Sequence, residues 1–261
     1  MTEQQIQRDN DFRIANWEQV INSESFKQNP AQCLRYLYDA VDAYASVGSR
    51  NSAIHAIDTA VSLCKGKLSL ERICDLSRMK TNLFLETGNL RYALDESTRA
   101  IKTMQSSVNY ETRALVLSNI AEVAAQATEE IVTLDSELDE EDCLDEKLSE
   151  TEYKSGVAQK IGNYKLAIRD IQKAIELSKN PNAEHHLFIS NCYIGAGDLK
   201  NARTHLERAM HIDGKSGTYA QDIRELWQIL MEDEEEAFSN QSTDQTPKYQ
   251  SMPKPSKPNL N

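Results

Sequence analysis

The chain has 261 residues, of which 27% are charged and 39% are apolar, and its formal net charge is −12. No apolar run approaches the roughly 18 residues that a membrane-spanning helix needs, so membrane insertion is not expected. The five cysteines form an odd set without Cys-x-x-Cys spacing, which argues against a disulfide framework and against a zinc cage. The first residues carry no secretion signal, and we expect a cytoplasmic protein.

The negative charge is concentrated in one stretch of the chain. Residues 129–152 hold twelve acidic residues and one basic residue, Lys147, a local net charge of −11, so the rest of the chain sums to about −1. The phosphate backbone of a nucleic acid attracts clustered lysine and arginine, and no such cluster occurs here. Direct nucleic-acid binding is therefore not expected.

Residues 1–30 form the first predicted unit. Ile14, Trp17 and Ile21 follow helical spacing within residues 11–21, which predicts an amphipathic helix. We expect this helix to pack as an N-terminal cap on the next unit.

Residues 31–213 contain one spacing that occurs four times: a glycine, an alanine five residues later and an alanine twelve residues later. The four copies are Gly48/Ala53/Ala60, Gly88/Ala93/Ala100, Gly162/Ala167/Ala174 and Gly197/Ala202/Ala209. A period near 34 residues is typical of stacked helical hairpins. Glycine permits a left-handed turn at the end of the first helix, and the alanines let neighbouring helices approach closely. The pattern therefore predicts a turn at each of the four glycines.

The longest interval between turn glycines, from 88 to 162, predicts one further, degenerate hairpin. Residues 110–127 have the apolar spacing of a long helix, and Thr128 and Glu129 stand where a turn would fall. We interpret residues 128–152 as an acidic degenerate unit that is broken near residues 139–143. The alternative is a solvated insertion loop, because blocks of like charge are often disordered.

Residues 214–238 predict the last ordered unit. Ile223, Leu226, Trp227 and Leu230 lie on one side of a helix in this segment, which fits the C-terminal capping helix that a repeat array needs. Residues 239–261 are mostly polar with several prolines, and we expect them to form a disordered tail.

The turn sequences resemble those of the tetratricopeptide repeat family. They read Gly-Asn-Leu-x-x-Ala from Gly88, Gly-Asn-Tyr-x-x-Ala from Gly162 and Gly-Asp-Leu-x-x-Ala from Gly197. The resemblance implies an all-α, right-handed α-solenoid of about five helical hairpins with an N-terminal helix and a C-terminal capping helix. The copies lack the family's tryptophan, Leu-Gly pair and closing proline, and Lys80 falls at a position that is usually apolar. The repeats are therefore divergent.

The resemblance also implies a non-catalytic protein–protein interaction module, an adaptor or scaffold that binds a peptide or helix of a partner protein in a concave groove. In this family the first helix of each hairpin lines that groove. The partner-binding residues implied by this register are Tyr38, Asp42, Arg78, Asn82, Leu187 and Asn191. Two alternatives are a chaperone or secretion escort that holds a basic client on an acidic strip, and a regulatory subunit of an enzyme. A homodimer also remains open.

Some members of the family grip the C-terminal carboxylate of their partner with basic and amide side chains. Arg78 and Asn82 have the spacing of the opening pair, and Asn119 is a candidate for the next position. The following hairpin offers Ser149 and Tyr153 where basic groups are needed. This carboxylate clamp is therefore incomplete.

Motifs for catalysis, metals and cofactors do not occur with the spacing that their chemistry needs. Gly214 to Ser216 resembles the end of a phosphate-binding loop but lacks the earlier glycine and the preceding strand. The histidines and the cysteine of residues 183–213 are not spaced as metal ligands. We therefore expect no catalytic residues, no metal and no cofactor.

Overall fold

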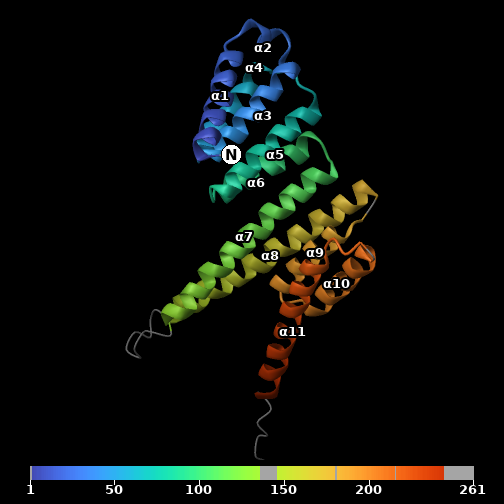
Figure 1. Cartoon of the computed structure of the whole chain (residues 1–261). Coiled ribbons are helices and arrows are strands. Elements are labelled where there is room, and N and C mark those ends of the chain that lie inside the picture. Colours follow the sequence, from blue (N-terminus) through green and yellow to red (C-terminus); the bar gives the residue numbers. More distant parts are fainter. Residues whose placement is uncertain (1, 136–145, 180, 215, 244–261) are drawn as a thin grey trace, which may run out of the picture.

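The computed structural model describes residues 2–135, 146–179, 181–214 and 216–243, which form eleven helices. Figure 1 shows that helices adjacent in sequence lie side by side and build an elongated stack. The predicted all-α solenoid is confirmed. In the described part of the chain, no helix combines the length and the apolar character needed to cross a membrane.

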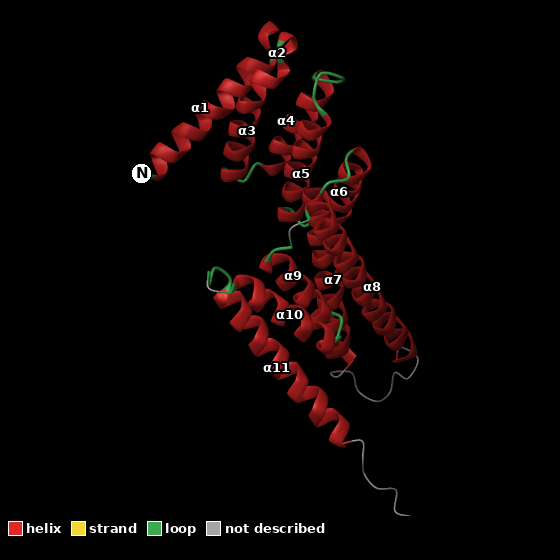
Figure 2. Cartoon of the chain, turned by 90° about the vertical axis from the view of Figure 1, so that its right-hand side faces the viewer, coloured by secondary structure: helices red, strands yellow, loops and turns green. Residues whose placement is uncertain are grey.

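Four helical hairpins make up the body of the stack. They are α3 (Pro30–Ser46) with α4 (Arg50–Leu63), α5 (Leu70–Glu86) with α6 (Leu90–Thr103), α7 (Ser107–Asp135) with α8 (Glu146–Ser178), and α9 (Ala183–Gly195) with α10 (Leu199–Asp213). The helices α1 (Glu3–Ile21) and α2 (Glu24–Gln28) precede them, and α11 (Ala220–Thr243) follows. Figure 2, turned by 90°, shows the same order along the stack.

Three of the four predicted turns occur at their glycines. Gly48, Gly88 and Gly197 have φ angles of 78°, 71° and 75°, in the left-handed region that a side chain disfavours. In each turn the N–H after the glycine donates to the carbonyl five residues earlier, at 2.8–2.9 Å. This bond closes the first helix and turns the chain into the second one.

All eight alanines of the repeated spacing are buried, with 0–3% of their surface exposed. Their small side chains let the second helix of each hairpin approach its neighbours closely. Ala167 and Ala174 of the third copy are as buried as the others. The alanine part of the pattern therefore holds in every copy.

The predicted turn at Gly162 is wrong, because Gly162 lies inside the continuous helix α8. The predicted turn at Thr128 and Glu129 is also wrong, since α7 continues to Asp135. The two helices pack against each other as one long antiparallel pair. The interval between Gly88 and Gly162 therefore belongs to one extended hairpin, and the described residues contain four hairpins instead of about five. The break predicted at 139–143 lies outside the described residues.

Helices α1 and α11 lie at the two ends of the stack. Trp17 of α1 is buried and meets Phe26 of α2 edge to face, with ring centroids 5.7 Å apart. At the other end, Ile223 and Leu230 of α11 are buried in the cluster that includes Leu187 of α9. Helix α11 extends to Thr243, beyond the predicted start of the tail at residue 239, and residues 244–261 lie outside the described residues.

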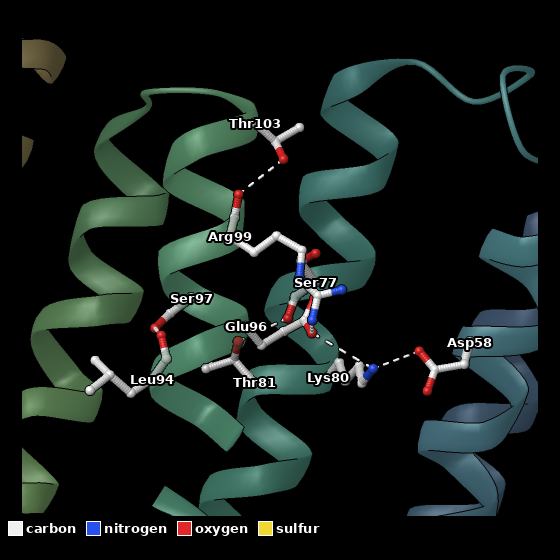
Figure 3. Close-up of polar contacts among 9 residues, drawn as sticks. All are labelled: Asp58, Ser77, Lys80, Thr81, Leu94, Glu96, Ser97, Arg99 and Thr103. Atoms are coloured by element: carbon white, nitrogen blue, oxygen red, sulfur yellow. Dashed lines mark hydrogen bonds and ion pairs between the residues drawn. The ribbon is translucent and has the colours of Figure 1, made fainter. Parts of the chain in front are cut away.

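Lys80 occupies its usually apolar position because it joins two neighbouring hairpins. Its Nζ lies 2.6 Å from Asp58 Oδ1 of α4 and 3.6 Å from Glu96 Oε2 of α6. Arg99 makes a second ion pair with Glu96 at 2.6 Å, and the Glu96 side chain is only 4% exposed. Figure 3 shows Lys80 between the two carboxylates. A buried carboxylate needs such partners, because burial of an unpaired charge costs several kcal/mol.

Candidate partner-binding groove

The first helices of three consecutive hairpins, α5, α7 and α9, line a groove of about 630 Å³, which we call the α5–α7–α9 groove. The end of α8 and the segment that leads into α9 complete its wall. Its lining residues are Arg78, Asn82, Glu111, Thr112, Leu115, Ile171, Ser178, Asn182, Glu184, His185 and Phe188.

Arg78 and Asn82 of α5, two of the residues implied by the repeat register, lie on one wall of this groove. The Arg78 guanidinium donates to Asp75 Oδ1, one turn earlier in α5, at 3.1 Å. This bond fixes the direction of the guanidinium. The Asn82 side chain is exposed, so its amide is accessible for hydrogen bonding to a ligand.

The opposite walls come from α7 and α9, where Glu111 and His185 meet. The His185 Nε2 and Glu111 Oε1 atoms are 3.1 Å apart. The Asn182 N–H points at His185 Nδ1 at 3.4 Å, and the Asn182 side chain accepts from the His185 N–H at 2.8 Å. Because Nδ1 accepts in this capping box, the ring proton of neutral His185 belongs on Nε2, which donates to Glu111.

An apolar strip lies between these polar walls. Leu115 of α7 is 43% exposed and Phe188 of α9 is half-buried, and both line the groove. Ile171 of α8 also lines the groove and is buried. A leucine that exposes this much of its surface inside a groove provides a contact for an apolar side chain of a ligand.

The remaining residues implied by the register do not line this groove. Tyr38 packs against the hydrophobic cluster that α1 to α5 form, and its hydroxyl is buried without a hydrogen-bond partner. Asp42 on α3 and Asn191 on α9 are exposed elsewhere. Leu187 is only 7% exposed, because α10 and α11 pack over it. Leu187 therefore lies in the packed core of α9, α10 and α11 and not in this groove.

Two of the side chains considered for a carboxylate clamp, those of Arg78 and Asn119, make hydrogen bonds within their own helices. Arg78 donates to Asp75 at 3.1 Å, and the Asn119 amide nitrogen donates to the Leu115 carbonyl at 2.8 Å. The side chains of Ser149 and Tyr153 lie outside the described residues. The described part of the groove therefore does not assemble a basic clamp.

Register alone did not identify Glu111, Leu115, His185 and Phe188 as groove residues. Helix α7 does not end at a turn glycine, so the repeat spacing assigns no register to Glu111 or Leu115. In α9 the residues that face the groove, Glu184, His185 and Phe188, are offset from the pair expected there. In the sequence Leu115 stands among the apolar residues Ala114, Val116 and Leu117, which are buried, so no local signal marks it as exposed.

The described residues contain no group of three or more histidine, cysteine, aspartate or glutamate side chains placed to hold a metal ion. His186 and His205 form a pair in which their Nδ1 atoms are 3.0 Å apart. Burial lowers the pKa of His186, and burial with the neighbouring His186 and Arg208 lowers the pKa of His205 to about 4. Burial also raises the pKa of Cys192 to about 12, so its thiol stays protonated and packs as an apolar group.

No protein-family model matches the sequence, and no curated protein sequence matches it. Among solved structures the chain is similar to MamA, with 18% identity over 79% of this chain and 90% of that chain and a TM-score of 0.48. It is also similar to MamA from Desulfovibrio magneticus, with 15% identity over 77% of this chain and 95% of that chain and a TM-score of 0.44.

A third similar structure is the complex of the TPR2AB domain of yeast Sti1 with pHSP90. The identity is 16% over 85% of this chain and 98% of that chain, and the TM-score is 0.30. Similarities at this level concern the fold alone. The left-handed turn glycines, the buried alanine pairs and the stacked antiparallel hairpins define an all-α solenoid of helical hairpins, the fold implied by the resemblance to tetratricopeptide repeats.

Proposed function

We propose that the chain is a non-catalytic protein–protein interaction module, an adaptor or scaffold, that binds a peptide or helix of a partner protein in the α5–α7–α9 groove. The observation that carries this proposal is the convergence of three hairpins on one groove with an apolar strip and polar walls. Binding sites commonly combine such an apolar contact surface with a few placed polar groups.

The chemistry of the groove supports binding and gives each residue a role. An apolar side chain of the ligand would lie on Leu115 and Phe188 and remove their exposed surface from water, at about 25 cal/mol per Å². The Asn82 amide both donates and accepts, so it can pair with the backbone of an extended peptide. Each such hydrogen bond contributes about 0.5–1.5 kcal/mol net.

A selection of short random peptides on the full-length protein tests this proposal. Peptides that bind are titrated against the variants Asn82→Ala and Leu115→Ser. Both should bind more weakly, because they remove a hydrogen-bonding amide and the apolar contact of the groove. The matched controls are Asn51→Ala and Leu63→Ser, which change exposed residues outside the groove. Selected peptides that bind all groove variants and controls equally would refute the proposal.

A further inference from the structure

The charges around the α5–α7–α9 groove are mostly negative. Glu111 and Glu184 line it, and Asp75 lies directly behind Arg78. Arg78 is the one arginine or lysine among the lining residues described, and its guanidinium already donates to Asp75 at 3.1 Å. Asp75 also lies 3.9 Å from Arg72, but neither of these two residues lines the groove. Among the lining residues the two glutamates outnumber the one arginine, so the lining carries an excess of acidic side chains.

Neighbouring groups hold both glutamates in place. The Glu111 Oε1 atom lies 3.1 Å from His185 Nε2, and His185 Nδ1 accepts from the Asn182 backbone N–H. Glu184 Oε2 lies 3.4 Å from the Tyr219 hydroxyl, which precedes α11. The charge of Glu184 is the largest of the causes that raise the pKa of Tyr219. Both carboxylates line the groove, and each has acceptor positions left for a cation.

From this charge complementarity we infer that the groove selects a basic peptide, in which lysine or arginine flanks one apolar side chain. The apolar side chain lies on Leu115 and Phe188, and the cationic groups pair with Glu111 and Glu184. An acidic peptide would face like charges on these walls, which costs affinity. This inference rests on the proposed binding function and specifies the chemistry of the partner.

The net negative charge of the whole chain also favours the binding of a basic ligand. The net charge is −12, and residues 129–152 contribute −11 of it. A protein field of one sign raises the association rate of ligands of the opposite sign, and salt screens this effect. A basic peptide should therefore associate faster at low salt.

The peptide selection described above also tests this inference. Peptides that the full-length protein selects should carry a net positive charge and at least one large apolar residue. In the variant Glu111→Gln/Glu184→Gln, the glutamine oxygens can still accept from His185 and Tyr219, so only the charges are lost. This variant should bind the selected basic peptides roughly two- to thirtyfold more weakly, the range expected for two exposed ion pairs.

The matched control is Asp95→Asn/Glu207→Gln, which removes two exposed carboxylates outside the groove. It should bind within about twofold of the unmodified protein at about 0.15 M salt, where distant charges are screened. Equal weakening by this control would overturn the inference, because it would assign the effect to overall charge. Groove-dependent peptides that are neutral or acidic would overturn the basic preference and leave the proposed function standing. Failure to select any groove-dependent peptide would instead refute the proposed function, and the inference with it.

Discussion

Replacement of Gly162 by alanine should stabilise the protein, because Gly162 lies inside helix α8. Its φ angle is outside the left-handed region, and a Cβ added there would meet no atom within 4 Å. Glycine inside a helix is less favourable than alanine by about 0.5–1 kcal/mol, chiefly through backbone entropy. The free energy of unfolding should rise by about this amount. The melting temperature should rise by roughly 1–4 °C in a protein of this size.

Thermal and urea unfolding followed by helical circular dichroism measures the change, and Gly88→Ala is the matched control. Gly88 also has open space around it, but its φ angle is 71°. Alanine in the left-handed region costs about 1–2 kcal/mol, so this variant should be destabilised. The two substitutions should therefore have opposite signs. Equal destabilisation by both would refute the continuous helix and restore the turn expected at Gly162.

Four further substitutions test packing, charge and titration. Gly195→Ala should destabilise by about 1–3 kcal/mol in urea unfolding, because its Cβ would lie 2.5 Å from the buried Tyr164 ring; an unchanged midpoint would contradict this. Glu96→Ala should cost about 3 kcal/mol, since it removes a buried carboxylate that pairs with the largely buried Lys80, whereas removal of the exposed ion pair in Glu86→Ala should cost less than about 1 kcal/mol. The pKa of His205 is lowered to about 4 from an unfolded value of about 6.5, so protonation favours the unfolded chain. The free energy of unfolding should fall by about 1–2 kcal/mol between pH 6.5 and pH 4, after allowance for the partial exposure of His205. Urea titrations across this pH range should show a smaller fall for His205→Phe.

The hairpin turns show which parts of the fold were accessible from the sequence. At Gly48, Gly88 and Gly197 the turn needs a left-handed backbone, and glycine supplies it locally. The buried alanines follow at a fixed spacing, so these turns could be predicted from the sequence. Gly162-Asn163-Tyr164 has nearly the same letters as Gly88-Asn89-Leu90, yet it is helical. The difference arises from the pairing of α7 with α8, a tertiary interaction that no local pattern contains.

The groove residues were likewise only partly predictable from the sequence. Arg78 and Leu187 both stand ten residues before a turn glycine, and the repeat register treats them alike. Arg78 lines the groove, whereas Leu187 is covered because α11 packs on α9. The helix that closes the end of the array therefore buries Leu187, although Leu187 has the same position within its repeat as Arg78. Leu115 is exposed because α8 packs against the other face of α7, and this packing could not be predicted from the sequence.

Helix α7 connects the groove to the acidic stretch, and its length keeps the two regions far apart. Glu111 lines the groove, and Glu129, where the acidic stretch begins, is eighteen residues further along the same helix. At 1.5 Å per residue the two lie about 27 Å apart. Charges at this distance are screened at physiological salt, where the Debye length is about 8 Å. The acidic stretch should therefore change the association rate of a short basic peptide at low salt and leave its dissociation rate unchanged. A partner that extends along α7 beyond the groove would contact both regions, and only such a partner should lose affinity at physiological salt when the acidic stretch is neutralised.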